Sequence, residues 1–325
     1  MSWRTGDDPA HDRTAPGSAS CEALAQAIAD LEPLTVLCAP DDAEDVRGRV
    51  CPGVEVLPVG GDGHRTLPAF VIAPDGVQAV LRGAPTTRPR TPRRWLRPTN
   101  ATVADLTGVP ATRSLLRLGS IRSDGWGTVL ATESDLLDPR ERRTREQVED
   151  ELVALTGALQ VVWLPTGLGD PAAGHVDPVA TFAAPGVVLV HDQPATGHPD
   201  HEVTAVAVAV LEVARDSRGL RMRIVRVPAP ARGRDEAGRW LHWSYLDHVL
   251  VNGGVVVPVF DDARDGEAVE LLAEVHHGRE IVVVDARPLS TRGHGLRCLT
   301  VGQPTGRAAL DRRSPVGRSL PVERG

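Results

Sequence analysis

Short apolar runs that are rich in β-branched residues and bounded by Pro or Gly recur along this chain, with amphipathic segments between them. The runs predicted as buried strands are 34–38, 54–57, 69–72, 161–164, 186–190, 222–225, 254–257 and 280–284. The segments predicted as helices are 21–31, 145–155, 201–215 and 265–275. Alternation of these two kinds of element predicts an α/β or α+β fold.

The composition limits the class of protein. A chain of 325 residues that is 41% hydrophobic can bury a substantial core, as one large domain or two ordinary ones. Its net charge of -7 argues against a nucleic-acid partner, which would require a basic surface that displaces counterions from phosphate. No secretory segment opens the chain and no apolar run approaches the ~20 residues of a membrane helix. We therefore expect a cytoplasmic, soluble protein with no membrane partner.

Both ends of the chain are polar. Residues 1–20 and 303–325 are predicted to be disordered tails, which leaves 21–302 as the folded body. Within that body, residues 82–97 crowd Pro, Thr and Arg around Trp95. A charged, Pro-rich loop is favoured there over a specific anion-binding arm. All 36 cationic side chains of the chain are arginine, which we attribute to codon bias, so arginine counts alone carry little functional weight.

One cysteine and a distant His-x-Asp pattern are the strongest candidates for chemistry. Cys298 follows a Gly-His-Gly-Leu-Arg stretch, and Gly174-His175-Val176-Asp177 lies far upstream. Such a pair can act as a thiol nucleophile and its acid/base partner. The alternatives are a small buried apolar cysteine and a hydrogen-bonded core histidine. The other cysteines, Cys21, Cys38 and Cys51, show no CxxC spacing, so we expect reduced thiols and no metal site or cofactor.

Several blocks around these residues resemble the agmatine deiminases and bacterial-type peptidylarginine deiminases. The stretch Gly-Ser-Ile-Arg-Ser-Asp-Gly-Trp-Gly-Thr at 119–128 is similar to that family's Gly-Ser-Ile-His-x-Asp-Gly-x-Gly-Thr, and 244–254 is similar to its Ser-Tyr-x-Asn-Phe-Tyr-x-x-Asn-Gly-Gly. The remaining blocks lie at 136–140, 161–170, 174–177 and 185–189, and Cys298 stands where the family has its nucleophile. The resemblance implies a single pentein domain over 21–302, a five-bladed α/β propeller with pseudo-fivefold symmetry and a central site.

The resemblance also implies a reaction. Cysteine attacks the carbon of a guanidinium, histidine protonates the leaving ammonia, and water hydrolyses the covalent intermediate, with agmatine or a peptidyl arginine as substrate and putrescine biosynthesis as the route. Because guanidinium is a permanent cation, such a site needs carboxylates. The family supplies three. Asp177 matches one of them, but the second position is Arg117 and the third, in the block 62–68, is Arg65.

Other positions of the resemblance also change toward positive charge. The family's histidine before the nucleophile is Arg297, its Gly-Ser-Ile-His histidine is Arg122, and its asparagine is Gly295. An arginine about 4 Å from a guanidinium would cost roughly 4 kcal/mol at an effective dielectric of ~20. We therefore predict a small-molecule or peptide substrate that is not a guanidinium, with an anionic compound as one option. The predicted catalytic residues are Cys298, His175 and Asp177, and the predicted substrate-binding residues are Arg117, Arg65, Asp124 and Arg297.

Three hypotheses follow from these residues. The favoured one is a thiol-dependent hydrolase, or transferase, that acts on a C–N bond through a covalent Cys298 intermediate, with His175 as general acid/base. The second is a non-catalytic pentein used for binding or regulation, with the pocket closed by arginine–aspartate pairs. The third is a true agmatine or arginine deiminase whose missing acids come from elsewhere, such as Asp62 or Asp124. A carboxylate near Cys298 would favour this third hypothesis.

A second group of polar residues lies at 191–201. It contains His191, Asp192, His198, Asp200 and His201. Without a helical ligand pair, a solvated loop is favoured there over a metal site. No Walker loop or dinucleotide fingerprint is present, because the Asn-Gly-Gly at 252–254 leads into a predicted strand rather than a helix.

Overall fold

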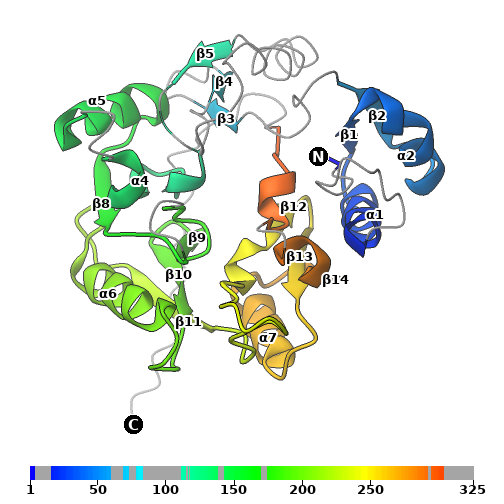
Figure 1. The fold of residues 1–325 in the computed structure, drawn as a ribbon. Helices are drawn as coiled ribbons and strands as arrows, with labels where there is room; N and C mark the ends of the chain where they lie inside the picture. Colours follow the sequence, from blue (N-terminus) through cyan, green and yellow to red (C-terminus); the bar gives the residue numbers. More distant parts are fainter. Residues whose placement is uncertain are drawn as a thin grey trace.

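Five small sheets follow one another around a ring in the computed structural model of this protein (Figure 1). The structure describes residues 1–3, 16–59, 69–72, 78–82, 111–114, 116, 118–137, 143–169, 174–291 and 294–303. In the described part, four sheets have three strands and one has two. No described helix has the length and apolar character needed to span a bilayer.

Three units of the ring share one ββαβ pattern. In each, an antiparallel strand pair is followed by a helix and by a strand parallel to the second. The first unit contains β6 (Ile121–Ser123), β7 (Thr128–Thr132), α5 (Arg145–Thr156) and β8 (Gln160–Leu164). The second contains β9 (Ala180–Ala184), β10 (Val187–Asp192), α6 (Asp200–Val213) and β11 (Arg223–Pro228). The third contains β12 (Val249–Val251), β13 (Gly254–Val259), α7 (Asp265–Val275) and β14 (Glu280–Asp285).

The two remaining units show parts of the same strand pattern in their described residues. One sheet contains β3 (Ala69–Ile72), β4 (Gln78–Arg82) and β5 (Ala111–Arg113), paired antiparallel and then parallel. The other pairs β1 (Thr35–Cys38) in parallel with β2 (Glu55–Pro58) across α2 (Ala43–Arg49). Ser2 bridges to Leu37 of this sheet. Five repeated units around a ring are the architecture predicted for 21–302.

Local sequence explains where the helices begin and end. Thr144 caps α5 by accepting a hydrogen bond from Gln147, whose side chain reaches back to the Thr144 backbone. The helix stops at Gly157, which has a left-handed φ of 68° that a residue without Cβ adopts at little cost. All eight predicted strands and all four predicted helices are present, with shifts of a few residues at some ends. The segment 82–97 begins at the last residue of β4, and 83–97 lie outside the described residues.

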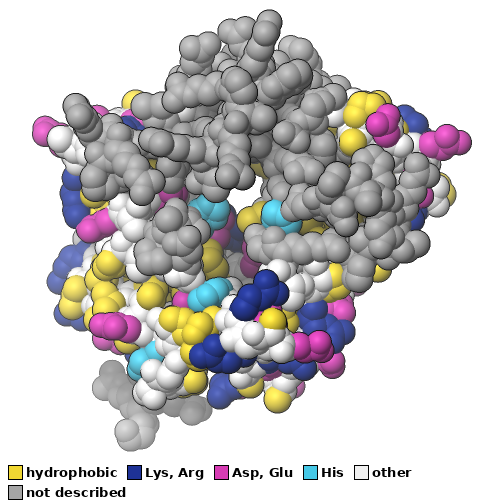
Figure 2. Space-filling view, in the orientation of Figure 1, with side chains coloured by type: hydrophobic (Ala, Val, Ile, Leu, Met, Phe, Trp, Pro, Cys, Tyr) yellow, Lys and Arg dark blue, Asp and Glu magenta, His cyan; other side chains and the backbone are white. Residues whose placement is uncertain are grey.

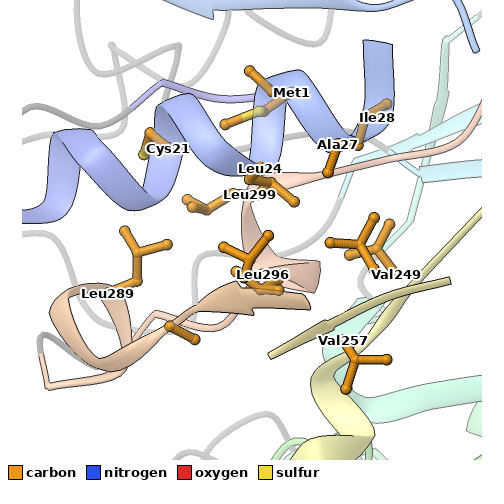
Figure 3. Packing of buried hydrophobic residues seen from close by; sticks show 14 of the residues in the cluster. Met1, Cys21, Leu24, Ala27, Ile28, Val249, Val257, Leu289, Leu296 and Leu299 are labelled. Carbon is orange, nitrogen blue, oxygen red and sulfur yellow. The ribbon is translucent and has the colours of Figure 1, made fainter. Parts of the chain in front are cut away.

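The largest core cluster packs α1 (Pro16–Ala29) against the segment that contains Cys298 (Figure 3). Leu24 of α1 and the residues Leu296 and Leu299 all belong to this cluster and are fully buried. The N–H of Ser2 donates to the carbonyl of Leu299 at 2.7 Å. The start of the chain therefore supports the backbone on both sides of Cys298.

The prediction of a disordered tail over 1–20 is wrong for the residues described there. Trp3 is 1% exposed, Met1 is also buried, and α1 begins at Pro16. The polar composition of the segment hid these two large apolar side chains, whose burial beside β1 favours order over chain entropy. Residues 4–15 and 304–325 lie outside the described residues.

Candidate active site

The three predicted catalytic residues line one cavity of about 370 Å³. His175, Asp177 and Cys298 all line it, together with Asp247. Figure 2 shows one face of the molecule hollowed near its centre, with histidine side chains around the hollow. One wall comes from residues 235 and 239–244. The volume suits a small ligand.

Cys298 lies in the short 3-10 helix η6 (Arg297–Leu299). Its neighbours Leu296 and Leu299 are buried on the core side, whereas Cys298 is exposed and lines the cavity. The alternative of a buried apolar cysteine is therefore wrong for Cys298, although Cys21 and Cys38 are buried thiols of that kind. Burial of the two leucines holds the turn, so the thiol is presented on a rigid element.

His175 is positioned by glycines of two other blocks. A Cβ at Gly119, in η4 (Leu118–Ser120), would lie 2.8 Å from Nδ1 of His175, and a Cβ at Gly167 would collide with the His175 backbone. The next residue, Val176, donates its N–H to the carbonyl of Gly119 at 2.7 Å. The Gly-Ser-Ile block and the His-x-Asp block therefore meet, and the close contact between them requires glycine at 119.

Asp177 is paired with arginine inside the protein. Arg122 forms an ion pair with Asp177, and Nη1 of Arg297 lies 3.9 Å from its Oδ1. The pKa of Arg122 is lowered to about 10, mainly by burial; Asp177 and Cys298 oppose this shift and Arg297 adds to it. The arginine–aspartate pairing that a closed pocket would require is present for Arg122. The same arginine interacts electrostatically with Cys298, the candidate nucleophile.

Asp247 is a cavity carboxylate that the sequence analysis missed. It ends η5 (Tyr245–Asp247), and its carboxylate lies against the backbone of Gly295, where a Cβ would overlap it. The backbone amides of Arg297 and Leu296 hydrogen-bond to it. Burial raises the pKa of Asp247 to about 7, Asp177 adds to that rise, and Arg297 opposes it.

The resemblance contained a sequence signal that could have identified Asp247 as a site residue. Asp247 stands in place of the asparagine in Ser-Tyr-x-Asn, and Gly295 replaces an asparagine shortly before the nucleophile. The two changes meet in space, because the room left by Gly295 is filled by the Asp247 carboxylate. The pair of changes places an acid in the same cavity as Cys298.

The segment 191–201 is not the solvated loop that the sequence predicted. His191, His198 and Asp200 are all buried, and Nδ1 of His242 lies 2.6 Å from Oδ2 of Asp200. Burial raises the pKa of Asp200, but hydrogen bonds from His242 and Gly169 outweigh it and lower the pKa overall. The polar residues are buried because they satisfy one another. Among the described residues, no group of His, Cys, Asp and Glu is placed to hold a metal ion.

None of the four predicted substrate-binding residues is among the described residues that line the cavity, although Arg297 lies beside Asp177. Asp124 lies in the β6–β7 turn, where Oδ1 accepts hydrogen bonds from the N–H groups of Trp126 at 2.7 Å and Thr128 at 2.9 Å. Its assignment to the site is corrected, because its carboxylate stabilises the turn. Arg65 and Arg117 lie outside the described residues, as does Asp62.

Ser244, in the cavity wall, connects two blocks of the sequence. Its hydroxyl lies 2.9 Å from the carbonyl of Pro178 and 3.1 Å from Nδ1 of His191. Burial lowers the pKa of His191 to about 4, so the ring is neutral at ordinary pH. This contact joins the Ser-Tyr-x-Asp segment to the residue that follows Asp177, and the network fixes their relative position.

Comparisons with known proteins agree with this geometry. Residues 90–304 match the family described as Porphyromonas-type peptidyl-arginine deiminase. A Streptomyces avermitilis protein named "Putative agmatine deiminase" is 37% identical over 94% of this chain and 93% of its own length. The agmatine deiminase of Stutzerimonas stutzeri is 31% identical over 94% and 92%.

A solved structure agrees on the fold. The agmatine deiminase of Enterococcus faecalis superposes with a TM-score of 0.79, at 23% identity, over 92% of this chain and 88% of that one. At this identity, the likeness concerns the fold alone. The ring of five units is therefore the pentein arrangement that the sequence blocks predict.

Proposed function

Since the chain belongs to the Porphyromonas-type peptidyl-arginine deiminase family, we propose that it is a cysteine-dependent hydrolase that deiminates a small guanidino compound of the agmatine type. The observation that carries the proposal is the cavity that holds Cys298, His175, Asp177 and the additional carboxylate Asp247. This was the third hypothesis drawn from the sequence, with Asp247 in the role there given to Asp62 or Asp124. The names of the relatives, agmatine deiminases at 31 to 37% identity, favour it over an altered substrate.

The proposed reaction proceeds through a covalent intermediate. The Cys298 thiolate attacks the guanidinium carbon and forms a C–S bond, and ammonia leaves with a proton supplied by His175. His175 then takes a proton from water as the water oxygen bonds to the same carbon. The C–S bond breaks, the thiolate returns, and the product carries a ureido group. As the carbonyl forms, the second proton of the water is released and is taken up by ammonia. Water and the guanidinium are consumed, and ammonium and the neutral ureido compound are released.

Asp247 supplies negative charge that the replaced acids would otherwise provide. A carboxylate about 4 Å from a guanidinium gains roughly 4 kcal/mol at an effective dielectric of ~20, which is of the order lost by one acid-to-arginine change. Burial raises the pKa of Asp247 to about 7, and a bound guanidinium would favour its ionised form. Asp177, which pairs with Arg122, contributes a second carboxylate to the same cavity.

A second candidate is hydrolysis of a C–N bond in an anionic substrate. Arg122 and Arg297 favour it, because both lie at Asp177 and could bind a carboxylate. The comparisons give this candidate no support. A non-catalytic, binding role is the further alternative, and the pairing of Arg122 with Asp177 is the contact that a closed pocket would use.

The test compares ammonia release from agmatine, arginine and 4-guanidinobutyrate, which presents an anion in place of the amine of agmatine. We expect turnover of agmatine and loss of turnover in Cys298→Ser, while Cys51→Ser, a change at a cysteine outside the cavity, keeps the rate. Intact mass should show an adduct on Cys298. Turnover of 4-guanidinobutyrate alone would favour the anionic candidate. No turnover and no adduct with any guanidino compound would refute the proposal.

A further inference from the structure

A histidine–aspartate pair occupies the cavity wall and has no role in the proposed chemistry. Nδ1 of His242 lies 2.6 Å from Oδ2 of Asp200, and the other Asp200 oxygen accepts the N–H of Gly169 at 2.9 Å. Asp200 is 1% exposed, whereas the His242 side chain is 33% exposed and lines the cavity. A buried carboxylate thus holds an imidazole whose other edge is open.

The ring of His242 is fixed in orientation. Gly169 has a left-handed φ of 73°, and a Cβ there would lie 3.0 Å from Cδ2 of His242. His198 packs edge-on against the same ring, with centroids 5.7 Å apart. His198 is itself held, because its Nδ1 accepts the N–H of Asp200 and its Nε2 lies 3.2 Å from the carbonyl of Leu241. The imidazole is therefore preorganised rather than free to rotate.

A buried carboxylate, Asp200, lies behind this part of the wall. The pKa of Asp200 is lowered overall despite burial, and in the neutral tautomer of His242 whose Nδ1 donates to this carboxylate, Nε2 carries no proton. Nε2 is then a hydrogen-bond acceptor, and no described residue donates to it. Arg239 is paired with Asp235 at 2.7 Å, and Arg234 stacks on Trp240 with 3.4 Å to the ring centroid. The neighbouring arginines are thus engaged by other groups.

We propose that the His242–Asp200 pair binds the distal ammonium group of the substrate, with Nε2 of His242 as the acceptor. The inference rests on the proposed function, because that function supplies a guanidino compound whose other end is an amine. A preformed acceptor backed by a carboxylate suits a primary ammonium, which is a compact donor of three hydrogen bonds. The pair is then a specificity-determining element, separate from the cysteine and histidine that perform the reaction.

The test compares agmatine with n-butylguanidine, which has the same guanidinium and no amine. We expect His242→Ala to lower the ratio of kcat/KM for agmatine to that for n-butylguanidine by about tenfold to a hundredfold, the range for a hydrogen bond to a charged group. Asp200→Asn should shift the ratio in the same direction. The matched control is His201→Ala, because His201 lies outside the cavity and bonds to the carbonyl of Gln193 at 2.7 Å.

Binding to Cys298→Ser protein, measured by calorimetry, gives the same comparison without turnover. An unchanged ratio in His242→Ala, with agmatine and n-butylguanidine both processed, would overturn the inference and leave the proposed function standing. The inference would also be overturned if the unmodified protein preferred 4-guanidinobutyrate to agmatine and His242→Ala lost that preference, since the pair would then bind an anion. Failure of the proposed function looks different, because no guanidino compound would be processed by the unmodified protein.

Discussion

Replacing Asp247 by asparagine should make the protein more stable at high pH and less active. The carboxylate lies against Gly295, and burial raises its pKa from 3.8 to about 7. At 1.36 kcal/mol for each pKa unit, this difference corresponds to about 4 kcal/mol. Because the folded pKa is raised, the cost of ionisation is absent below about pH 4 and complete above about pH 7. Partial exposure reduces the figure, so we expect a gain of about 2 to 4 kcal/mol at about pH 8.

The assay is urea unfolding of both proteins between about pH 4.5 and pH 8. The difference in unfolding free energy between Asp247→Asn and the parent should be small at the acidic end and grow as the pH rises. Ammonia release from agmatine should fall in the same variant, since an amide cannot carry the charge that pairs with a guanidinium. Stability and activity therefore change in opposite directions.

Asp235→Asn is a control at another residue of the same cavity, and its expected change in unfolding free energy has the opposite sign. The pKa of Asp235 is lowered, first by the N–H of Arg239, so its ionised form stabilises the fold and the variant should lose stability above about pH 4. The reasoning would be refuted if Asp247→Asn were less stable than the parent at about pH 8. A difference that did not change with pH would refute it equally.

Two further predictions concern the candidate base and the buried histidines. Gly119→Ala places a Cβ 2.8 Å from Nδ1 of His175 and should lower kcat by about a hundredfold, with a much smaller change in thermal unfolding; an unimpaired rate of ammonia release would contradict it. Burial is the main cause of the lowered pKa values of three histidines. The pKa is about 4 for His191, about 3 for His248 and about 4 for His276. Since their folded pKa values are depressed, unfolding free energy should fall from about pH 6.5 toward pH 4, by up to roughly 3 kcal/mol for His191 alone. The measurement is urea unfolding of the Asp247→Asn variant, in which the opposing contribution of the Asp247 carboxyl is absent. An unfolding free energy that does not change with pH in this variant would contradict the prediction.

Much of the fold was predictable from local sequence. Strands such as β13 and β14 are β-branched runs, and α7 occupies the predicted range of residues. Three of the missed strands, β5, β6 and β12, have three residues each, which is too short for a periodic pattern to show. The other missed strands, β4, β7 and β9, have five residues each. The order of the blocks also identified Cys298 and His175 as candidates, because each stands in a motif with its own neighbours.

Other features depended on contacts between distant segments. Asp247 meets Gly295, His242 meets Asp200, and Trp3 is buried in the core beside α1. None of these pairings has a local pattern, since each joins residues that only the ring of units brings together. The sequence by itself determined eight of the described strands, the four longest helices and the candidate nucleophile with its histidine. Only the tertiary structure decided which charges face one another, because ionisation and binding depend on distance, burial and hydrogen bonding between groups that are far apart along the chain.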